Sequence, residues 1–170
     1  MTTTTRAPID YSRWQTPIGL NWYRTDYALQ DALRRMLSAG DLTWAEPLLD
    51  RFGELCGGPI ARRAEVSDKN PPRLVKHDRE GNEVDEVVHH ETALATKRDL
   101  WEFGFPAFSQ RVQAQEGREV PGAVATALSY MLNQAETGMT CAVGMTAGVA
   151  DLVGRYAPAW WRDEAYWRLT

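Results

Sequence analysis

NPPRLVKHDREGNEVDEV, residues 70 to 87, separates two long stretches of helical pattern and carries a different pattern itself. Asn70-Pro71-Pro72 should end any preceding helix, because proline lacks the amide hydrogen and restricts the residue before it. Two alternating segments, RLVKHD and EVDEV, flank a turn that ends at Gly81, whose positive φ a four-residue hairpin loop commonly needs. We predict one β-hairpin, at about residues 73–88. Two strands are only marginally stable alone, so we expect this hairpin to lie against helices.

Helical periodicity dominates the chain before the hairpin. Asp26 suits the N-cap of a helix over YALQDALRRML, and Gly40 is expected to end that helix. Its apolar stripe is Leu29, Ala32, Leu33 and Met36. Thr43 and Glu46 have capping-box spacing, which predicts the start of a second helix. The face of that helix is Leu48, Leu49, Phe52 and Leu55, and Gly57-Gly58-Pro59 should weaken or kink it before IARRAEV continues.

Helices resume after the hairpin, over HETALATKRDLWEFG, over FSQRVQAQ and from Pro121 onward. The third carries a broad apolar stripe of Ala123, Val124, Ala127, Leu128, Met131, Leu132 and Ala135. The following segment, MTCAVGMTAGVA, is uncharged and apolar or small all round, so we expect it to be buried on all sides. Its Gly144 and Gly148 would let another backbone approach closely. The predicted fold is mainly α, an orthogonal or up-down bundle of about six helices with one inserted β-hairpin.

Composition sets limits on the kind of protein. The 170 residues are 44% hydrophobic and 25% charged, which is typical of one globular domain. Residues 1–25 are polar and without helical period, so we expect an N-terminal arm. The net charge of -4 offers no general attraction to nucleic acid or an anionic membrane. No run of about 18 apolar residues occurs, and the N-terminus lacks the apolar region of a secretory signal, so we expect no membrane partner and a cytoplasmic location.

No combination of residues predicts a self-contained active site. Cys56 and Cys141 are far apart and have no close Cys or His partner, so two reduced thiols are expected rather than a disulfide or a zinc site. Cys141 lies in the most apolar stretch, where burial would raise its pKa and make it inert. His89 and His90 are adjacent, and adjacent residues of an extended segment point to opposite sides. We therefore predict no catalytic residue and no metal ligand.

The uncharged segment MTCAVGMT has two interpretations. Apolar helical stripes usually belong to a core, so simple core packing is the ordinary reading. The alternative is the wall of a deep apolar cleft, a role that suits methionine because its flexible thioether fits variable ligands. The residues by themselves leave both open.

The order of these parts resembles the acyl-CoA dehydrogenase superfamily, and more closely its bacterial branch typified by the DNA-alkylation-response flavoprotein. In that branch a hairpin with the pattern NPP-x-L-x-x-x-D-x-x-G-x-x-x-D-x-V interrupts the N-terminal helical domain. The matching residues here are Asn70, Pro71, Pro72, Leu74, Asp78, Gly81, Asp85 and Val87. LWEFGF, ALSYMLNQAETGMTCAVGMT and AWW follow in the same order, and the likeness extends from about residue 20 to the end.

The resemblance implies that residues 26–170 are an N-terminal α-domain without the FAD-binding β-domain and the C-terminal helical domain. The chain would then be a truncated piece, a proteolytic fragment or one part of a split enzyme, inactive by itself. Family members hold FAD between those two further domains, and the base that removes the α-proton typically belongs to the C-terminal portion. The resemblance therefore implies FAD in the full-length protein and none on this chain alone.

The parent reaction implied is α,β-dehydrogenation of an acyl thioester, part of fatty acid metabolism, in which a base takes the α-proton while hydride passes to the flavin. This domain would contribute a wall of the acyl pocket and contacts in a homo-oligomer. The substrate-binding candidates are Thr140, Cys141, Val143 and Gly144. The implied partners are an acyl-CoA-type substrate and the missing domains, or a partner chain that carries them.

Two other functions stay open, a non-catalytic helical interaction module and a subunit of a split flavoenzyme. Nucleic-acid binding is not expected, because the branch is linked to DNA through a C-terminal basic region and this chain has no basic stripe. Seven tryptophans predict a large apolar contact surface, either a core or an interface. If helices here pack on a missing domain, they should leave a set of aromatic side chains partly uncovered and promote self-association. That set is Trp160, Trp161, Tyr166 and Trp167.

Overall fold

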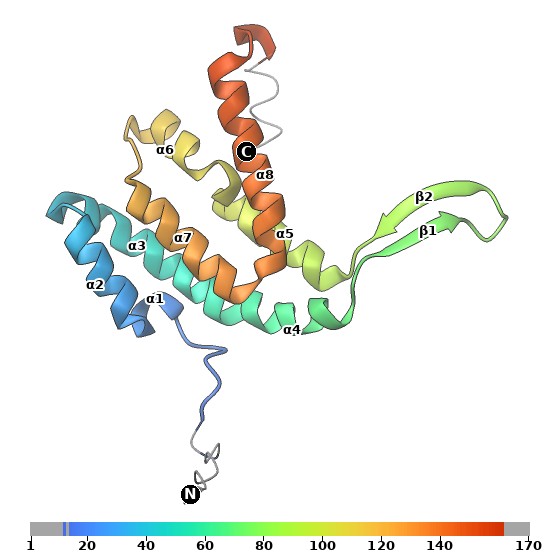
Figure 1. Cartoon of the computed structure of the whole chain (residues 1–170), viewed down its shortest axis with the longest axis horizontal. Helices are drawn as coiled ribbons and strands as arrows, with labels where there is room; N and C mark the ends of the chain where they lie inside the picture. Colours follow the sequence, from blue (N-terminus) through green and yellow to red (C-terminus); the bar gives the residue numbers. More distant parts are fainter. Residues whose placement is uncertain (1–11, 13, 162–170) are drawn as a thin grey trace, which may run out of the picture.

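A computed structural model describes residue 12 and residues 14–161, and it contains eight α-helices and one two-stranded antiparallel hairpin (Figure 1). The helices are α1 (Trp22–Thr25), α2 (Tyr27–Met36), α3 (Ala39–Leu55), α4 (Ala61–Lys69), α5 (Glu91–Phe103), α6 (Phe108–Glu116), α7 (Gly122–Ala135) and α8 (Thr137–Tyr156). A π-helical turn, η2 (Cys56–Ile60), joins α3 to α4, and a 3-10 turn, η3 (Phe105–Ala107), joins α5 to α6. The predicted mainly α fold with one inserted hairpin is confirmed.

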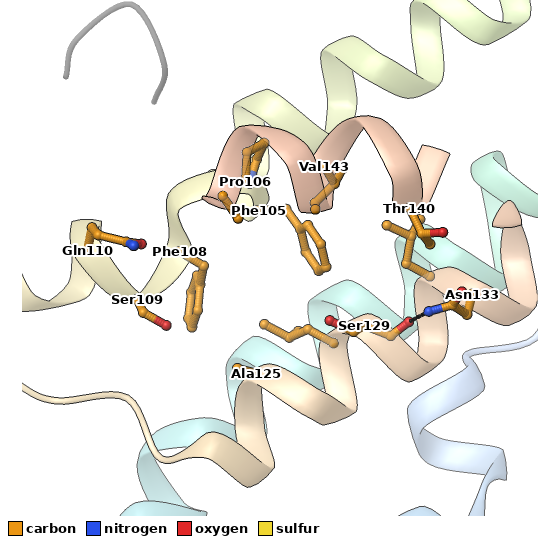
Figure 2. A pocket seen from close by; sticks show the side chains of 14 residues that line it. Phe105, Pro106, Phe108, Ser109, Gln110, Ala125, Ser129, Asn133, Thr140 and Val143 are labelled. Atoms are coloured by element: carbon orange, nitrogen blue, oxygen red, sulfur yellow. Dashed lines mark hydrogen bonds between the residues drawn. The ribbon is translucent and has the colours of Figure 1, made fainter. Parts of the chain in front are cut away.

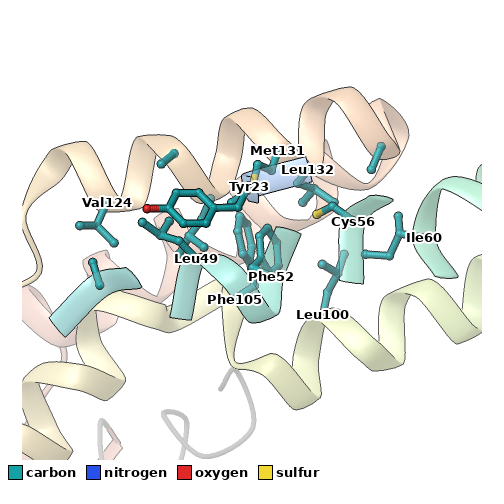
Figure 3. Packing of buried hydrophobic residues seen from close by; sticks show 14 of the residues in the cluster. Tyr23, Leu49, Phe52, Cys56, Ile60, Leu100, Phe105, Val124, Met131 and Leu132 are labelled. Atoms are coloured by element: carbon teal, nitrogen blue, oxygen red, sulfur yellow. The ribbon is translucent and has the colours of Figure 1, made fainter. Parts of the chain in front are cut away.

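The core forms where α3, α5, α7 and η3 meet (Figure 3). Phe52 of α3 is fully buried, and its ring stacks on that of Phe105 with centroids 5.1 Å apart. The apolar stripe predicted for α7 is confirmed, because all of its members except the partly buried Ala123 are buried: Val124, Ala127, Leu128, Met131, Leu132 and Ala135. α7 therefore lies at the centre of the bundle, in contact with α2, α3, η2 and α8.

Two glycines allow the N-terminal segment to lie directly on α3 and η2. A Cβ on Gly57 would lie 2.0 Å from the carbonyl oxygen of Leu20, and a Cβ on Gly53 would lie 2.5 Å from the amide nitrogen of Tyr23. The amide of Gly19 donates to the carbonyl oxygen of Gly57 over 2.7 Å. This approach buries Tyr23, so the last residues of the segment predicted as an arm form α1 and pack on the helical body.

The start of α3 differs from the prediction. Ser38 is its N-cap, and the Ser38 hydroxyl oxygen accepts a hydrogen bond from the amide of Asp41 over 3.1 Å. Gly40 therefore lies in the first turn of α3 and does not end α2. Thr43, the predicted cap, donates its hydroxyl to the carbonyl of Ala39 inside the helix. The prediction was wrong because Ser38 offers the same capping chemistry several residues earlier.

Two other local predictions are confirmed. Asp26 caps α2, and its carboxylate accepts from the amide of Leu29 over 2.8 Å. The Gly57-Gly58-Pro59 stretch interrupts the α-helical pattern, since η2 forms there before α4 continues. Proline removes one amide donor from the helical ladder, which is consistent with a local π turn at that point.

The hairpin forms at the predicted residues. Strand β1 (Arg73–His77) pairs with β2 (Glu83–Val88). The Asp78 carboxylate accepts from the amides of Glu80 and Asn82, and Gly81 has a φ of +87°. The expectation that the hairpin lies against helices is wrong, because it extends away from them (Figure 1). The physical reason is that α4 and α5 pack side by side, so the chain leaves and re-enters the body at one edge.

α8 also differs from the prediction. Val143, Ala150 and Val153 are its buried residues among those described, whereas Met145 is 74% exposed. A Cβ on Gly144 would meet nothing within 4 Å, so no backbone of the described chain approaches there. Residues 139–150 of the helix are apolar or small all round, but the fold covers this segment on one side only. No helix in the described part of the chain is long and apolar enough to cross a bilayer.

The close contact of Gly57 with Leu20 predicts how an added methyl group at this position changes stability. Gly57→Ala would place a Cβ against the Leu20 backbone and should lower the free energy of unfolding by about 1–3 kcal/mol. Gly148→Ala, in open space on α8, should leave stability unchanged or raise it by up to about 1 kcal/mol. Urea denaturation followed by circular dichroism measures both. Equal losses for the two variants would contradict the described approach of the N-terminal segment at Leu20 to η2.

Candidate functional site

A cavity of about 330 Å³ lies where α7 and α8 meet η3 and the start of α6 (Figure 2). Its apolar lining includes Phe105, Leu128, Leu132 and Val143. Its polar lining is Ser109, Gln110, Ser129, Asn133 and Thr140. The volume falls in the range of roughly 300–1,000 Å³ that small-molecule sites usually have.

The backbone conformation of Gly104 and short-range hydrogen bonds on α7 and α8 shape the lining of this cavity. Gly104 ends α5 in the left-handed conformation, with a φ of +81°, and turns the chain so that Phe105 enters the core. On α7, Ser129 and Asn133 are one turn apart, and the Asn133 side-chain amide donates to the Ser129 carbonyl over 2.8 Å (Figure 2). On α8, the Thr140 hydroxyl donates to the Thr137 carbonyl over 2.6 Å.

The structure brings together three of the four predicted substrate-binding residues. Thr140, Val143 and Gly144 line the cavity, because residues three and four apart share one face of a helix. Cys141 does not line it. One residue along an α-helix is a rotation of about 100°, which places Cys141 on the exposed side of α8.

The prediction that Cys141 is buried was wrong. Cys141, expected to be buried and inert, is exposed, whereas Cys56 in η2 is fully buried. Burial raises the pKa of the Cys56 thiol to about 12. Cys56 is therefore the unreactive thiol. The error arose because apolar neighbours along α8 do not show which side of the helix the fold covers.

Several lining residues were not predicted from the sequence. Ser129 and Asn133 come from α7, and Phe105 comes from η3. The sequence did contain a signal for Ser129 and Asn133. They lie four residues apart, and they directly follow Leu128 and Leu132 of the buried stripe. Nothing local indicated Phe105, whose part in the cavity depends on the packing of η3 against α8.

The chemistry of the lining is that of a binding surface. None of the described residues around the cavity is charged or titrates near neutral pH. Serine and threonine hydroxyls are weak nucleophiles without an adjacent base, and none of the lining residues is one. The cavity can hold an uncharged, largely apolar group and orient it by a few hydrogen bonds. It has no cation for a pyrophosphate, so its residues do not fit FAD.

The remaining titratable groups do not form a metal site in the described part of the chain. No group of three or more His, Cys, Asp or Glu side chains there could hold a metal ion. His90 is the N-cap of α5, and its Nδ1 accepts from the amide of Thr92. This histidine therefore has a structural role at the start of a helix.

Comparison with known proteins establishes the family. Residues 15–166 match the sequence profile of the adaptive response protein AidB N-terminal domain. The chain belongs to this family. AidB of Escherichia coli (strain K12), whose name places it provisionally among the acyl-CoA dehydrogenases, is 28% identical over 166 residues. That match covers 88% of this chain and 28% of AidB.

Two solved structures have the same fold. Bd2924 in its apo-form is 26% identical and has a TM-score of 0.72 over 85% of this chain. Caenorhabditis elegans ACDH-11, in complex with C11-CoA, has a TM-score of 0.77 over 97% of this chain at 20% identity, which shows the fold alone. The chain spans about 28% of the length of each relative. The resemblance to the N-terminal domain of acyl-CoA dehydrogenases is confirmed.

The two thiols should react differently in the native chain. Cys141 is exposed, so we expect it to react with a thiol reagent at mildly alkaline pH. Cys56 should remain unlabelled, because its raised pKa and burial leave almost no accessible thiolate. Mass spectrometry should show one label before and two after denaturation, and Cys141→Ser should abolish the first. Rapid labelling of both native thiols would contradict the described packing of η2.

Proposed function

We propose that this chain is the N-terminal domain of an FAD-dependent, acyl-CoA dehydrogenase-like oxidoreductase, in which it forms a wall of the acyl pocket. The observation that supports this most directly is the uncharged cavity lined by Thr140, Val143 and Gly144. Membership of the AidB N-terminal domain family provides the second support. The substrate class under this proposal is an acyl thioester of the acyl-CoA type.

The cavity residues would act by binding and orientation. Phe105, Leu128 and Val143 offer an apolar surface that would hold an acyl chain and exclude water. Asn133 uses one of its two side-chain N–H groups on the Ser129 carbonyl, which leaves the other for a bound polar atom. A proton acceptor for the α-carbon is not among the lining residues, so it would come from outside this chain.

FAD would bind to parts of the longer protein that lie outside this chain. When bound there, it supplies the acceptor for the hydride that leaves the substrate. We further propose a cytoplasmic location, contacts in a homo-oligomer and a place in fatty acid metabolism for the longer protein. We propose that the chain alone has no dehydrogenase activity, because FAD and the base would belong to other parts of the longer protein.

The exposed side of α8 suits the same proposal. We define the outer face of α8 as Met145, Val149, Leu152 and Tyr156, which are all exposed and recur at helical spacing. Trp160 and Trp161 beyond the helix are also exposed, as predicted, while Tyr166 and Trp167 lie outside the described residues. Contiguous exposed apolar side chains usually mark an interaction surface. We assign this face to packing against further segments of the longer protein.

A second function rests on the same face. A non-catalytic helical interaction module would also expose an apolar helix, and its partner would be a separate protein. The two functions differ in the role of the cavity, because an interaction module requires no ligand there. Acyl-thioester binding by the longer protein therefore distinguishes them.

Narrowing the cavity should change acyl-chain preference in the longer protein. Ala125→Leu adds volume to the α7 wall and should weaken binding of long-chain relative to short-chain acyl-CoA by about tenfold. Thr126→Leu, on the exposed side of the same helix, is the matched control and should leave the preference unchanged. Calorimetric titration with a series of acyl-CoA chain lengths measures both. An unchanged preference in Ala125→Leu would overturn the assignment of this cavity to the acyl chain.

A lysine should affect stability very differently on the two sides of α8. Leu152→Lys on the outer face should leave the free energy of unfolding of the isolated chain nearly unchanged and reduce its binding of an apolar dye. Val153→Lys, one residue further and buried, should cost several kcal/mol because it buries an unpaired charge. Dye fluorescence and urea denaturation provide the two readouts. Similar losses of stability in both variants would show that the outer face is covered in the isolated chain.

A further inference from the structure

The hairpin has an apolar face of its own, formed by Leu74, Val84 and Val87. These side chains are 57%, 44% and 54% exposed, respectively. Leu74 pairs with Val87 across the ladder, so the two lie on the same side of the hairpin. No helix of the described chain covers them, since the hairpin extends away from the body (Figure 1).

An irregularity in β2 brings Val84 onto this face. Val84 and Val87 are three residues apart, and in a regular strand an odd spacing puts side chains on opposite faces. The register shifts between the pairs Val75–Glu86 and His77–Glu83, so Val84 and Asp85 together oppose Lys76. Asp85 has a φ of 45°, the only positive value among non-glycine residues that the structure describes. The bulge therefore gathers the apolar side chains on one face.

The charges of the hairpin divide between its two halves. Residues 69–77, which contain β1, include three Lys or Arg residues and no Asp or Glu. Residues 78–86, which contain the turn and most of β2, include five Asp or Glu residues and one Arg. On the apolar face itself, Lys76 of β1 lies opposite Asp85 of β2. One strand of the hairpin is thus the electrostatic complement of the other.

We infer that the hairpin is a self-association arm whose occupant is the hairpin of a second copy of this chain. In the proposed dimer, a two-fold axis runs parallel to the strands, between the two facing hairpins. A rotation of 180° about this axis places β1 of one copy over β2 of the other. Leu74 then lies over Val87 of the partner subunit, and Lys76 lies near Asp85 of the partner subunit. Both apolar faces become covered, and each positive strand meets a negative one.

The arrangement also explains how an isolated two-stranded hairpin would persist. Two strands alone are marginally stable, whereas two hairpins packed face to face form a four-stranded, two-layered unit with an apolar interior. Edge-to-edge pairing of β1 with β1, or of β2 with β2, would bring like charges together and is disfavoured. The charge division therefore favours face-to-face packing over the two-fold symmetric edge-to-edge dimers. This inference does not rest on the acyl-pocket proposal.

The test is sedimentation equilibrium of the chain in a Leu152→Lys background, so that the outer face of α8 does not contribute to association. We expect a dimer whose dissociation constant rises at least about tenfold in Leu74→Asp, in Lys76→Glu and in Asp85→Lys. Asp85→Gly removes the charge but tolerates the positive φ, so it separates the effect of charge from that of backbone strain. It should weaken the dimer less than Asp85→Lys, which places a like charge opposite Lys76. Circular dichroism should show unchanged helix content in all variants.

The decisive measurement mixes two variants whose own dimers are weakened. When Lys76→Glu is mixed with Asp85→Lys, residue 76 of each variant faces a residue 85 of opposite charge in the other variant. We therefore expect a heterodimer. A monomeric starting protein, or a mixture that does not associate, would overturn the proposal. Lys76→Glu in the longer protein should leave acyl-CoA binding unchanged, so this test and that of the acyl pocket fail independently.

Discussion

The packing of α7 is the interaction on which both the core and the candidate site depend. Its stripe packs against α3 and η2 on one side, and α8 closes the cavity on the other. Leu128 and Leu132 belong to both, since they are buried in the core and also line the cavity. A shift or rotation of α7 would therefore open the core and reshape the site together, which couples the stability of the domain to the geometry of its pocket wall.

α8 provides the link between this closed core and the exposed surfaces. The side with Thr140, Val143 and Gly144 faces the cavity, and the opposite side, the outer face, is exposed. One helix can serve two partners because side chains three and four residues apart share a face, so two apolar stripes fit around the same axis. The described part of the chain thus buries a core but leaves apolar surface exposed on α8 and on the hairpin. Such surface normally marks places where other protein packs.

Local predictions succeeded where the backbone chemistry of one or two residues decides the conformation. Asp26 capped α2, Gly81 adopted the positive φ of the turn, and the stripe of α7 was buried as its spacing indicated. Ser38 shows the limit of such signals. Its capping chemistry competes with that of Thr43 a few residues later, and both fit the local pattern equally well.

The amino-acid sequence by itself determined the helices, the hairpin, the turn and the family resemblance, since each follows from side-chain type at a given spacing. Tertiary structure alone decided that Cys56 rather than Cys141 is buried, that the hairpin extends away from the body, and that residues of η3 complete the cavity. Periodicity shows which side of an element is apolar. Burial requires a second element to lie on that side, and its position depends on contacts between residues far apart in the chain.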